Sequence, residues 1–91
     1  MSETVWKYEM LDTEQAFEMP AGARVLDVAA QDGKPCLWAQ VDPARAKEWR
    51  SFVLVGTGIA MQGPLGTYVG TAHNVANLGL VMHVFEVADR G

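Results

Sequence analysis

The sequence predicts a small, mainly antiparallel all-β domain, because short apolar runs recur along the chain and turn-forming residues close each of them. Within the runs, apolar side chains tend to alternate with others at a period of two, which is typical of strands. Gly, Pro, Asp or Asn follows or separates the runs. The five clearest runs are Val5–Met10, Arg24–Gln31, Cys36–Val41, Ser51–Val55 and Leu80–Val87. We expect a small barrel or sandwich of about six or seven strands with one short helical turn.

The first two strands are expected to be half buried, with an aromatic inner face. The run Val5–Met10 alternates clearly, and Glu14–Met19 repeats the pattern more weakly. Pro20 and Gly22 then break the chain, since Pro cannot donate a ladder hydrogen bond and Gly permits a tight turn. The residues expected to face inward are Trp6, Tyr8, Met10, Phe17 and Met19.

The strongest hairpin signal is Asp32-Gly33, which lies between the runs Arg24–Gln31 and Cys36–Val41. Both central residues of a type I′ turn need a positive φ, which Asp and Gly tolerate. We place Leu26, Val28 and Ala30 on one face of the first strand. Both strands carry apolar residues on both faces, so they are expected either to be central or to offer one face to a partner chain.

The second half of the chain contains a helical signal and then more strands. Residues 42–48 start with an Asp cap and Pro43 at the first helical position, which predicts one or at most two turns of helix, with an extended loop tip as the alternative. After the strand Ser51–Val55, the glycines of 56–66 predict a long loop. Thr67–Thr71 is expected to be an edge strand in which Gly70 admits a close neighbour. Residues 73–79 are expected to form a loop before the closing strand, Leu80–Val87.

Length, charge and composition limit the class of protein. The 91 residues fit one domain, 1–91, and 49% hydrophobic residues are enough for one core. The net charge is −4, and the few basic residues form no cluster, so direct nucleic-acid binding is disfavoured. Cys36 is the only cysteine and just two histidines are present, so we expect no disulfide, no zinc-type metal site and no cofactor. No signal peptide and no membrane-spanning run is evident, and we expect a cytoplasmic protein.

Several motifs follow one another in an order seen elsewhere. They are VWKYEM, MPAGARVLDVAAQDGKPCLWAQVDP, RSFVLVGTG, TYVGT and LVMHVFE. With these motifs, nearly the whole chain resembles a family of short phage- and prophage-encoded proteins of uncharacterised function. The resemblance implies a phage or prophage origin and a bacterial cytoplasmic setting, and it implies no activity. Relatives often continue Gly-Thr-Gly with His-Pro, where this chain has Ile59-Ala60.

Binding residues are the best functional candidates that the sequence offers. Trp38 shares a mixed strand face with Gln40, and Trp49 precedes Arg50 at the start of another strand. Trp and Arg dominate the energetics of protein interfaces. We therefore name Trp38, Gln40, Trp49 and Arg50 as interface candidates, with ordinary core packing as the alternative for Trp38.

The signals for a ligand site or for catalysis are weaker. Gly56-Thr57-Gly58 suggests a phosphate loop, but no Lys and no helix follow it, so a bulge or strand end is the simpler interpretation. His83 lies on an apolar strand face and could help to bind a ligand, whereas His73 falls in a polar segment. Catalysis by Cys36 with His83 would need the two side chains to meet; the alternative is a buried, inert thiol.

These observations predict a non-enzymatic phage or prophage accessory protein that binds a host or phage protein. A homodimer is the simplest way to cover a second apolar face. Two alternatives stay open at this point. One is a protein that captures a nucleotide to counteract host defence, and the other is a minor structural component of the virion.

Overall fold

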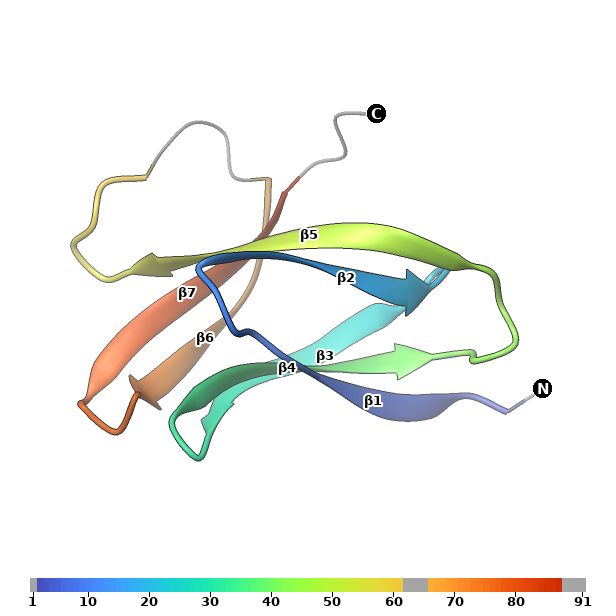
Figure 1. Cartoon of the computed structure of the whole chain (residues 1–91), viewed down its shortest axis with the longest axis horizontal. Helices are drawn as coiled ribbons and strands as arrows, with labels where there is room; N and C mark the ends of the chain where they lie inside the picture. Colours follow the sequence, from blue (N-terminus) through green and yellow to red (C-terminus); the bar gives the residue numbers. More distant parts are fainter. Residues whose placement is uncertain (1, 62–65, 88–91) are drawn as a thin grey trace.

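The computed structural model describes residues 2–61 and 66–87, which form seven strands in two antiparallel sheets. One sheet has the order β1-β4-β3 and the other the order β2-β5-β7-β6. Figure 1 shows β2 and β5 running above β3, β4 and β1. The all-β prediction is confirmed, and the architecture is that of two packed open sheets. The strands are β1 (Thr4–Glu9), β2 (Glu14–Pro20), β3 (Arg24–Gln31), β4 (Lys34–Val41), β5 (Lys47–Gly56), β6 (Thr67–Val75) and β7 (Leu80–Val87).

The core lies between the sheets and takes side chains from both. The inward positions predicted for β1 and β2 are confirmed: Met10 and Met19 are buried, and three aromatic rings pack against the same cluster. The ring centroid of Phe17 lies 5.3 Å from that of Tyr8 and 6.0 Å from that of Phe52. These rings therefore join β1, β2 and β5 across the sandwich. The buried hydrophobic residues of this cluster are Met10, Met19, Ala23, Val28, Leu37, Ala39, Val41, Phe52, Ala72 and Val84.

The central hairpin forms as predicted. Asp32 and Gly33 both have positive φ, 53° and 80°, and Gln31 pairs with Lys34 across the turn. One face assignment on β3 is wrong, because the register shifts between Val25 and Asp27. Such a bulge adds one residue to the strand and changes which side chains face inward. Val25 therefore packs against the core, and Leu26 is 46% exposed.

The two sheets approach each other closely along β3 and β6. A Cβ on Gly70 would lie 2.8 Å from the Cβ of Val28, so only glycine permits this approach. β6 is an edge strand, and its Gly70 admits a close neighbour as predicted. At the hairpin ends, which lie together in Figure 1, the Ala76 amide donates to the Gly33 carbonyl at 2.6 Å.

Two predictions for the connections need correction. Residues 42–46 form a β-turn and no helix: Arg45 N donates to the Asp42 carbonyl and Ala44 N to Asp42 Oδ1, each at 3.1 Å. A single helical turn is unstable alone, and here Ala21 N bonds to Ala46 O, which draws the segment into the start of β5. β6 also runs on to Val75, so the loop expected over 73–79 is reduced to a turn. Of the loop expected over 56–66, residues 62–65 lie outside the described part.

Candidate functional site

The four-stranded sheet has an outer face on which no described strand packs. Side chains alternate along a strand, and Met19, Phe52 and Val84 point into the core. The residues on the same strands that alternate with these form the outer face. It is mixed in chemistry, with an apolar centre, three aromatic side chains and two carboxylates. Its members are Glu14, Ala16, Glu18, Trp49, Ser51, Val53, Val55, Tyr68, Thr71, His83, Phe85 and Val87.

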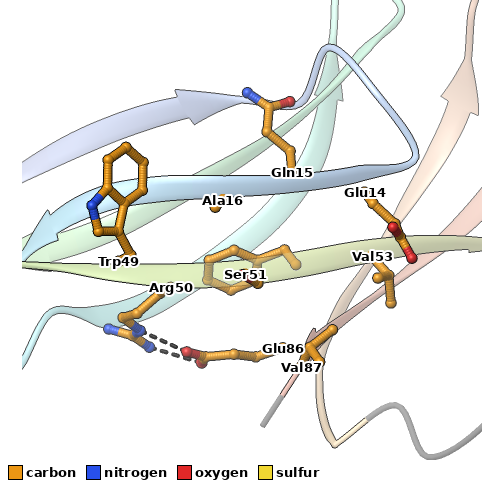
Figure 2. A pocket seen from close by; sticks show the side chains of 10 residues that line it. Glu14, Gln15, Ala16, Trp49, Arg50, Ser51, Val53, Glu86 and Val87 are labelled. Atoms are coloured by element: carbon orange, nitrogen blue, oxygen red, sulfur yellow. Dashed lines mark hydrogen bonds and ion pairs between the residues drawn. The ribbon is translucent and has the colours of Figure 1, made fainter. Parts of the chain in front are cut away.

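A groove of about 630 Å³ runs over β2, β5 and β7 on this outer face (Figure 2). Consecutive residues of each strand line it, because the groove contacts the backbone as well as the outward side chains. Trp49 stands beside it with 68% of its surface exposed, and Val53 and Val87 make its floor apolar. Glu14 contributes a carboxylate. The groove is lined by residues 14–16, 49–53, 86 and 87.

A second groove of about 430 Å³ continues from the first and shares Glu14 and Val53 with it. Asp12 adds another carboxylate at the start of β2, and the exposed side chains of Ile59 and Met61 add apolar surface. The two grooves together therefore form a strip of mixed polar and apolar surface, with acidic residues along its β2 side.

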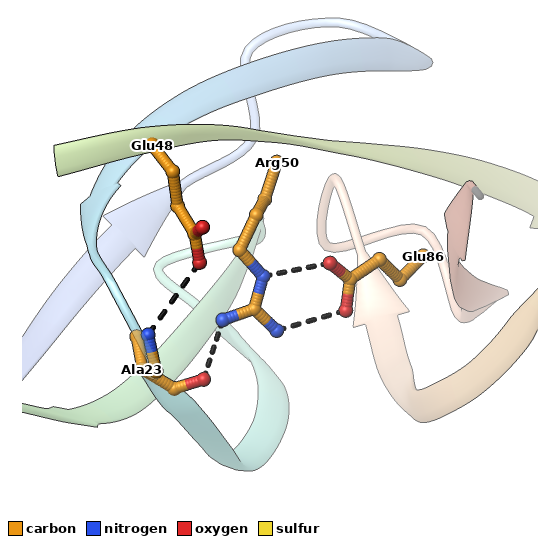
Figure 3. Close-up of polar contacts among 5 residues, drawn as sticks. Ala23, Glu48, Arg50 and Glu86 are labelled. Atoms are coloured by element: carbon orange, nitrogen blue, oxygen red, sulfur yellow. Dashed lines mark hydrogen bonds and ion pairs between the residues drawn. The ribbon is translucent and has the colours of Figure 1, made fainter. Parts of the chain in front are cut away.

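Trp49 and Arg50 leave β5 in opposite directions, as Figure 2 shows. The Arg50 side chain is 18% exposed and forms two parallel hydrogen bonds to Glu86, at 2.7 and 2.9 Å. It also donates to the Ala23 carbonyl, while Glu48 accepts a hydrogen bond from the Gly22 amide (Figure 3). The hydrogen bond to Glu86 raises the pKa of the Arg50 guanidinium. Arg50 therefore ties the four-stranded sheet to the start of β3, and only Trp49 of this pair is exposed on the outer face.

Trp38 and Gln40, the other interface candidates, lie on the outer face of the three-stranded sheet. Both are half buried, and Gln40 donates to Glu3. Trp38 lies between Lys7 on β1 and Asp27 on β3. The four interface candidates therefore do not lie together. Trp49 is on the outer face of the four-stranded sheet, Trp38 and Gln40 are on the outer face of the three-stranded sheet, and Arg50 points between the sheets.

Cys36 shares the outer face of the three-stranded sheet with Trp38, and it is almost completely buried. Its exposed fraction is 1%, and Lys7 Nζ reaches across β4 to Gln31 Oε1 at 2.7 Å. Burial raises the pKa of the Cys36 thiol, which leaves it protonated and inert at neutral pH. His83 belongs to the outer face of the other sheet, so the two side chains do not meet.

His83 is the centre of a chain of hydroxyl groups on the outer face of the four-stranded sheet. Its Nε2 lies 2.8 Å from Thr57 Oγ1, and its Nδ1 lies 3.0 Å from Thr71 Oγ1, which bonds to the hydroxyl of Tyr68. Thr57 Oγ1 also donates to the Val81 carbonyl at 3.3 Å. Because that bond uses the Thr57 hydroxyl proton, Thr57 Oγ1 can only accept a hydrogen bond from His83 Nε2. A neutral His83 with its proton on Nε2 therefore gives each of these side-chain groups a hydrogen-bond partner. Among residues 2–61 and 66–87 no carboxylate bonds to this chain of groups, so the described set lacks the group that orients a catalytic histidine.

The Gly56-Thr57-Gly58 segment ends β5 and does not form a phosphate cradle. The Thr57 amide donates to the Val81 carbonyl and the Ile59 amide to the Gly56 carbonyl, each at 3.1 Å. Gly58 has φ 85° and a Cβ there would meet nothing within 4 Å. Of the four candidate ligand residues, the structure joins only Thr57 and His83 by hydrogen bonds.

The sequence interpretation did not identify the acidic side of the groove. Glu14 and Glu18 lie four residues apart on β2, so they point to the same face, with Ala16 between them. The signal was visible as Glu-x-Ala-x-Glu, but only the pairing of β2 with β5 places Glu18 opposite Trp49.

Comparison with known proteins gives a family. A family described as a domain of unknown function, DUF7352, matches residues 1–91. The chain belongs to the DUF7352 family. No curated protein and no solved structure matches it. Within residues 2–61 and 66–87, no helix is long and apolar enough to cross a membrane, and no three potential metal ligands are grouped.

Proposed function

We propose that this member of the DUF7352 family is a non-enzymatic accessory protein of a phage or prophage, and that it acts by binding another protein. The single observation that carries the proposal is the exposure of Trp49 beside a groove of mixed polar and apolar lining. A Trp that is 68% exposed contributes little to its own fold, whereas Trp is the residue most enriched in binding hot spots.

The size of the outer face supports a transient complex. Four strands spaced about 4.8 Å apart and about 23 Å long give roughly 450 Å² of flat sheet before side-chain relief is counted. This area corresponds to the small interfaces of transient signalling complexes, below about 600 Å² per partner. Nucleotide capture has less support, because the amides of Thr57 and Ile59 in the glycine segment are already bonded within the chain.

The test is affinity purification with matched variants from phage-carrying bacteria. Trp49→Ser removes the exposed Trp, and Leu78→Ser removes a similarly exposed apolar side chain from the β6–β7 turn, where Leu78 is 75% exposed. A bound protein should be recovered with the wild type and with Leu78→Ser, and lost with Trp49→Ser. Equal recovery with all three folded proteins would refute the role of this face.

A further inference from the structure

We propose that the partner supplies an extended, basic segment, which adds a strand to the open edge of β2 and places Lys or Arg side chains beside Glu14, Glu18 and Trp49. This inference rests on the proposed function and names the chemistry of its partner.

The edge of β2 is available for pairing. In the described part of the chain, β2 is the terminal strand of its sheet and pairs only with β5, from Glu14 to Pro20. An unpaired edge presents a row of backbone amides and carbonyls that an extended peptide can bind. Pro20 ends the strand, since its nitrogen cannot donate to a neighbour. Met19 is fully buried, so the accessible stretch is the first part of β2, from Glu14 to Glu18.

The charge beside this edge is negative. Glu14 and Glu18 lie on one face about 13 Å apart, both are exposed, and neither makes an ion pair or hydrogen bond within the described residues. Asp12 extends the acidic side of the strip. The cation of Lys47 is on the same face as Trp49, but it lies at the end of β5 that pairs with Pro20, away from Glu14. The cation of Arg50 is turned inward and paired with Glu86.

A basic side chain fits this surface in two ways. Glu18 is the cross-strand partner of Trp49, so a strand beside β2 brings its side chains next to both the carboxylate and the indole. A Lys or Arg can lay its aliphatic stem against the apolar part of the groove, at Val53 and Val87, and its cation against the carboxylate or over the indole ring. Basic residues at alternate positions repeat about every 6.6 Å, which lets one segment reach both Glu14 and Glu18.

The same charges oppose a second copy of this chain at the edge. An antiparallel β2–β2 pair centred on Ala16 would place Glu14 of one copy opposite Glu18 of the other. Like charges directly opposite each other on paired strands are destabilising. The net charge of −4 adds to this repulsion, so the surface favours a basic partner over itself.

The test is a titration with a capped seven-residue peptide in which Lys alternates with Val, matching the seven residues of β2. Binding is followed by ¹⁵N–¹H correlation spectra of the whole chain at low ionic strength. Shifts should concentrate on the amides of β2 and on the Trp49 indole. The affinity should fall with added salt, and the doubly substituted Glu14→Gln, Glu18→Gln protein should bind about three- to tenfold more weakly.

The matched control removes the same charge beside the other sheet, as Glu3→Gln just before β1 with Asp27→Asn on β3. It should bind as the wild type does. Absence of binding, equal binding by both double variants, or equal binding of a peptide with Glu in place of Lys would overturn the inference. A dimer detected by sedimentation would also overturn it if hydrogen exchange showed that dimerisation protects the β2 amides. The peptide titration and the affinity purification are independent measurements. A failure of the basic-segment proposal therefore does not decide whether the chain binds another protein.

Discussion

The Arg50–Glu86 pair gives the sharpest test of the fold. Glu86→Gln keeps the shape of the side chain and removes its charge. Arg50 and Glu86 are 18% and 27% exposed, and the two hydrogen bonds measure 2.7 and 2.9 Å. Bonds to a partly buried charged group are worth more than surface ion pairs, and we expect a loss of about 2 kcal/mol in the free energy of unfolding. For a domain of this size, that loss lowers Tm by about 8–16 °C.

The assay is thermal and urea unfolding followed by circular dichroism, with Glu18→Gln as the matched control. Glu18 is exposed and makes no ion pair among the described residues, so the same chemical change there should alter stability by less than about 0.5 kcal/mol. Equal losses in the two variants, or a loss below about 0.5 kcal/mol for Glu86→Gln, would refute the stabilising role of the pair.

The pH dependence of this effect follows from the pKa of Arg50, which the hydrogen bond to Glu86 raises above its ordinary value. A raised pKa stabilises the folded state at every pH below the unfolded value and loses that contribution only as pH rises through the folded value. The Arg50 cation is therefore present throughout the neutral and mildly alkaline range. The difference between wild type and Glu86→Gln should stay constant from about pH 7 to pH 10.

Three further predictions follow from single packing and burial features. Gly70→Ala should destabilise the domain by about 1–3 kcal/mol in urea unfolding. Val28→Ala should relieve part of that loss because it removes Cγ2, one of the two Val28 atoms 2.8 Å from the new Cβ, while the Val28 Cβ stays. Burial raises the pKa of Tyr8 above 10.0, so its contribution to stability is present below pH 10 and is lost as pH rises through the folded value. Its hydroxyl is buried without a partner among the described residues, and Tyr8→Phe should keep or raise stability by up to about 1 kcal/mol at pH 7 while weakening the alkaline loss. Cys36 should react with a thiol reagent only at the rate of unfolding; labelling of the folded protein within seconds at pH 7 would contradict its burial.

Several local features were predictable because short-range chemistry decides them. Asp32 and Gly33 tolerate positive φ, so these two residues were enough to predict the hairpin turn. The alternation of Phe17 and Met19 identified the inner face of β2. Gly70 signalled a close approach, and the neighbour proved to be Val28 of β3.

Other features needed the assembled sheets. No residue marks the bulge at Val25–Asp27, which arises from pairing with β4 and turns Leu26 outward. The helical signal of residues 42–48 was genuine but short, and the hydrogen bond from Ala21 to Ala46 competes with it. Local propensity fails there because strand pairing contributes more than one unsupported turn of helix.

By itself, the sequence determined the class of the fold, an approximate count of six or seven strands and the central turn, since these depend on periodicity and on the conformational range of single residues. The tertiary structure decided which apolar faces meet, and so which aromatic residues stay exposed. Trp49 and Arg50 are neighbours in the chain, yet one stands beside an outer groove and the other is held between the sheets by Glu86. Adjacent residues of a strand point to opposite faces, and only sheet packing decides which of those faces is covered.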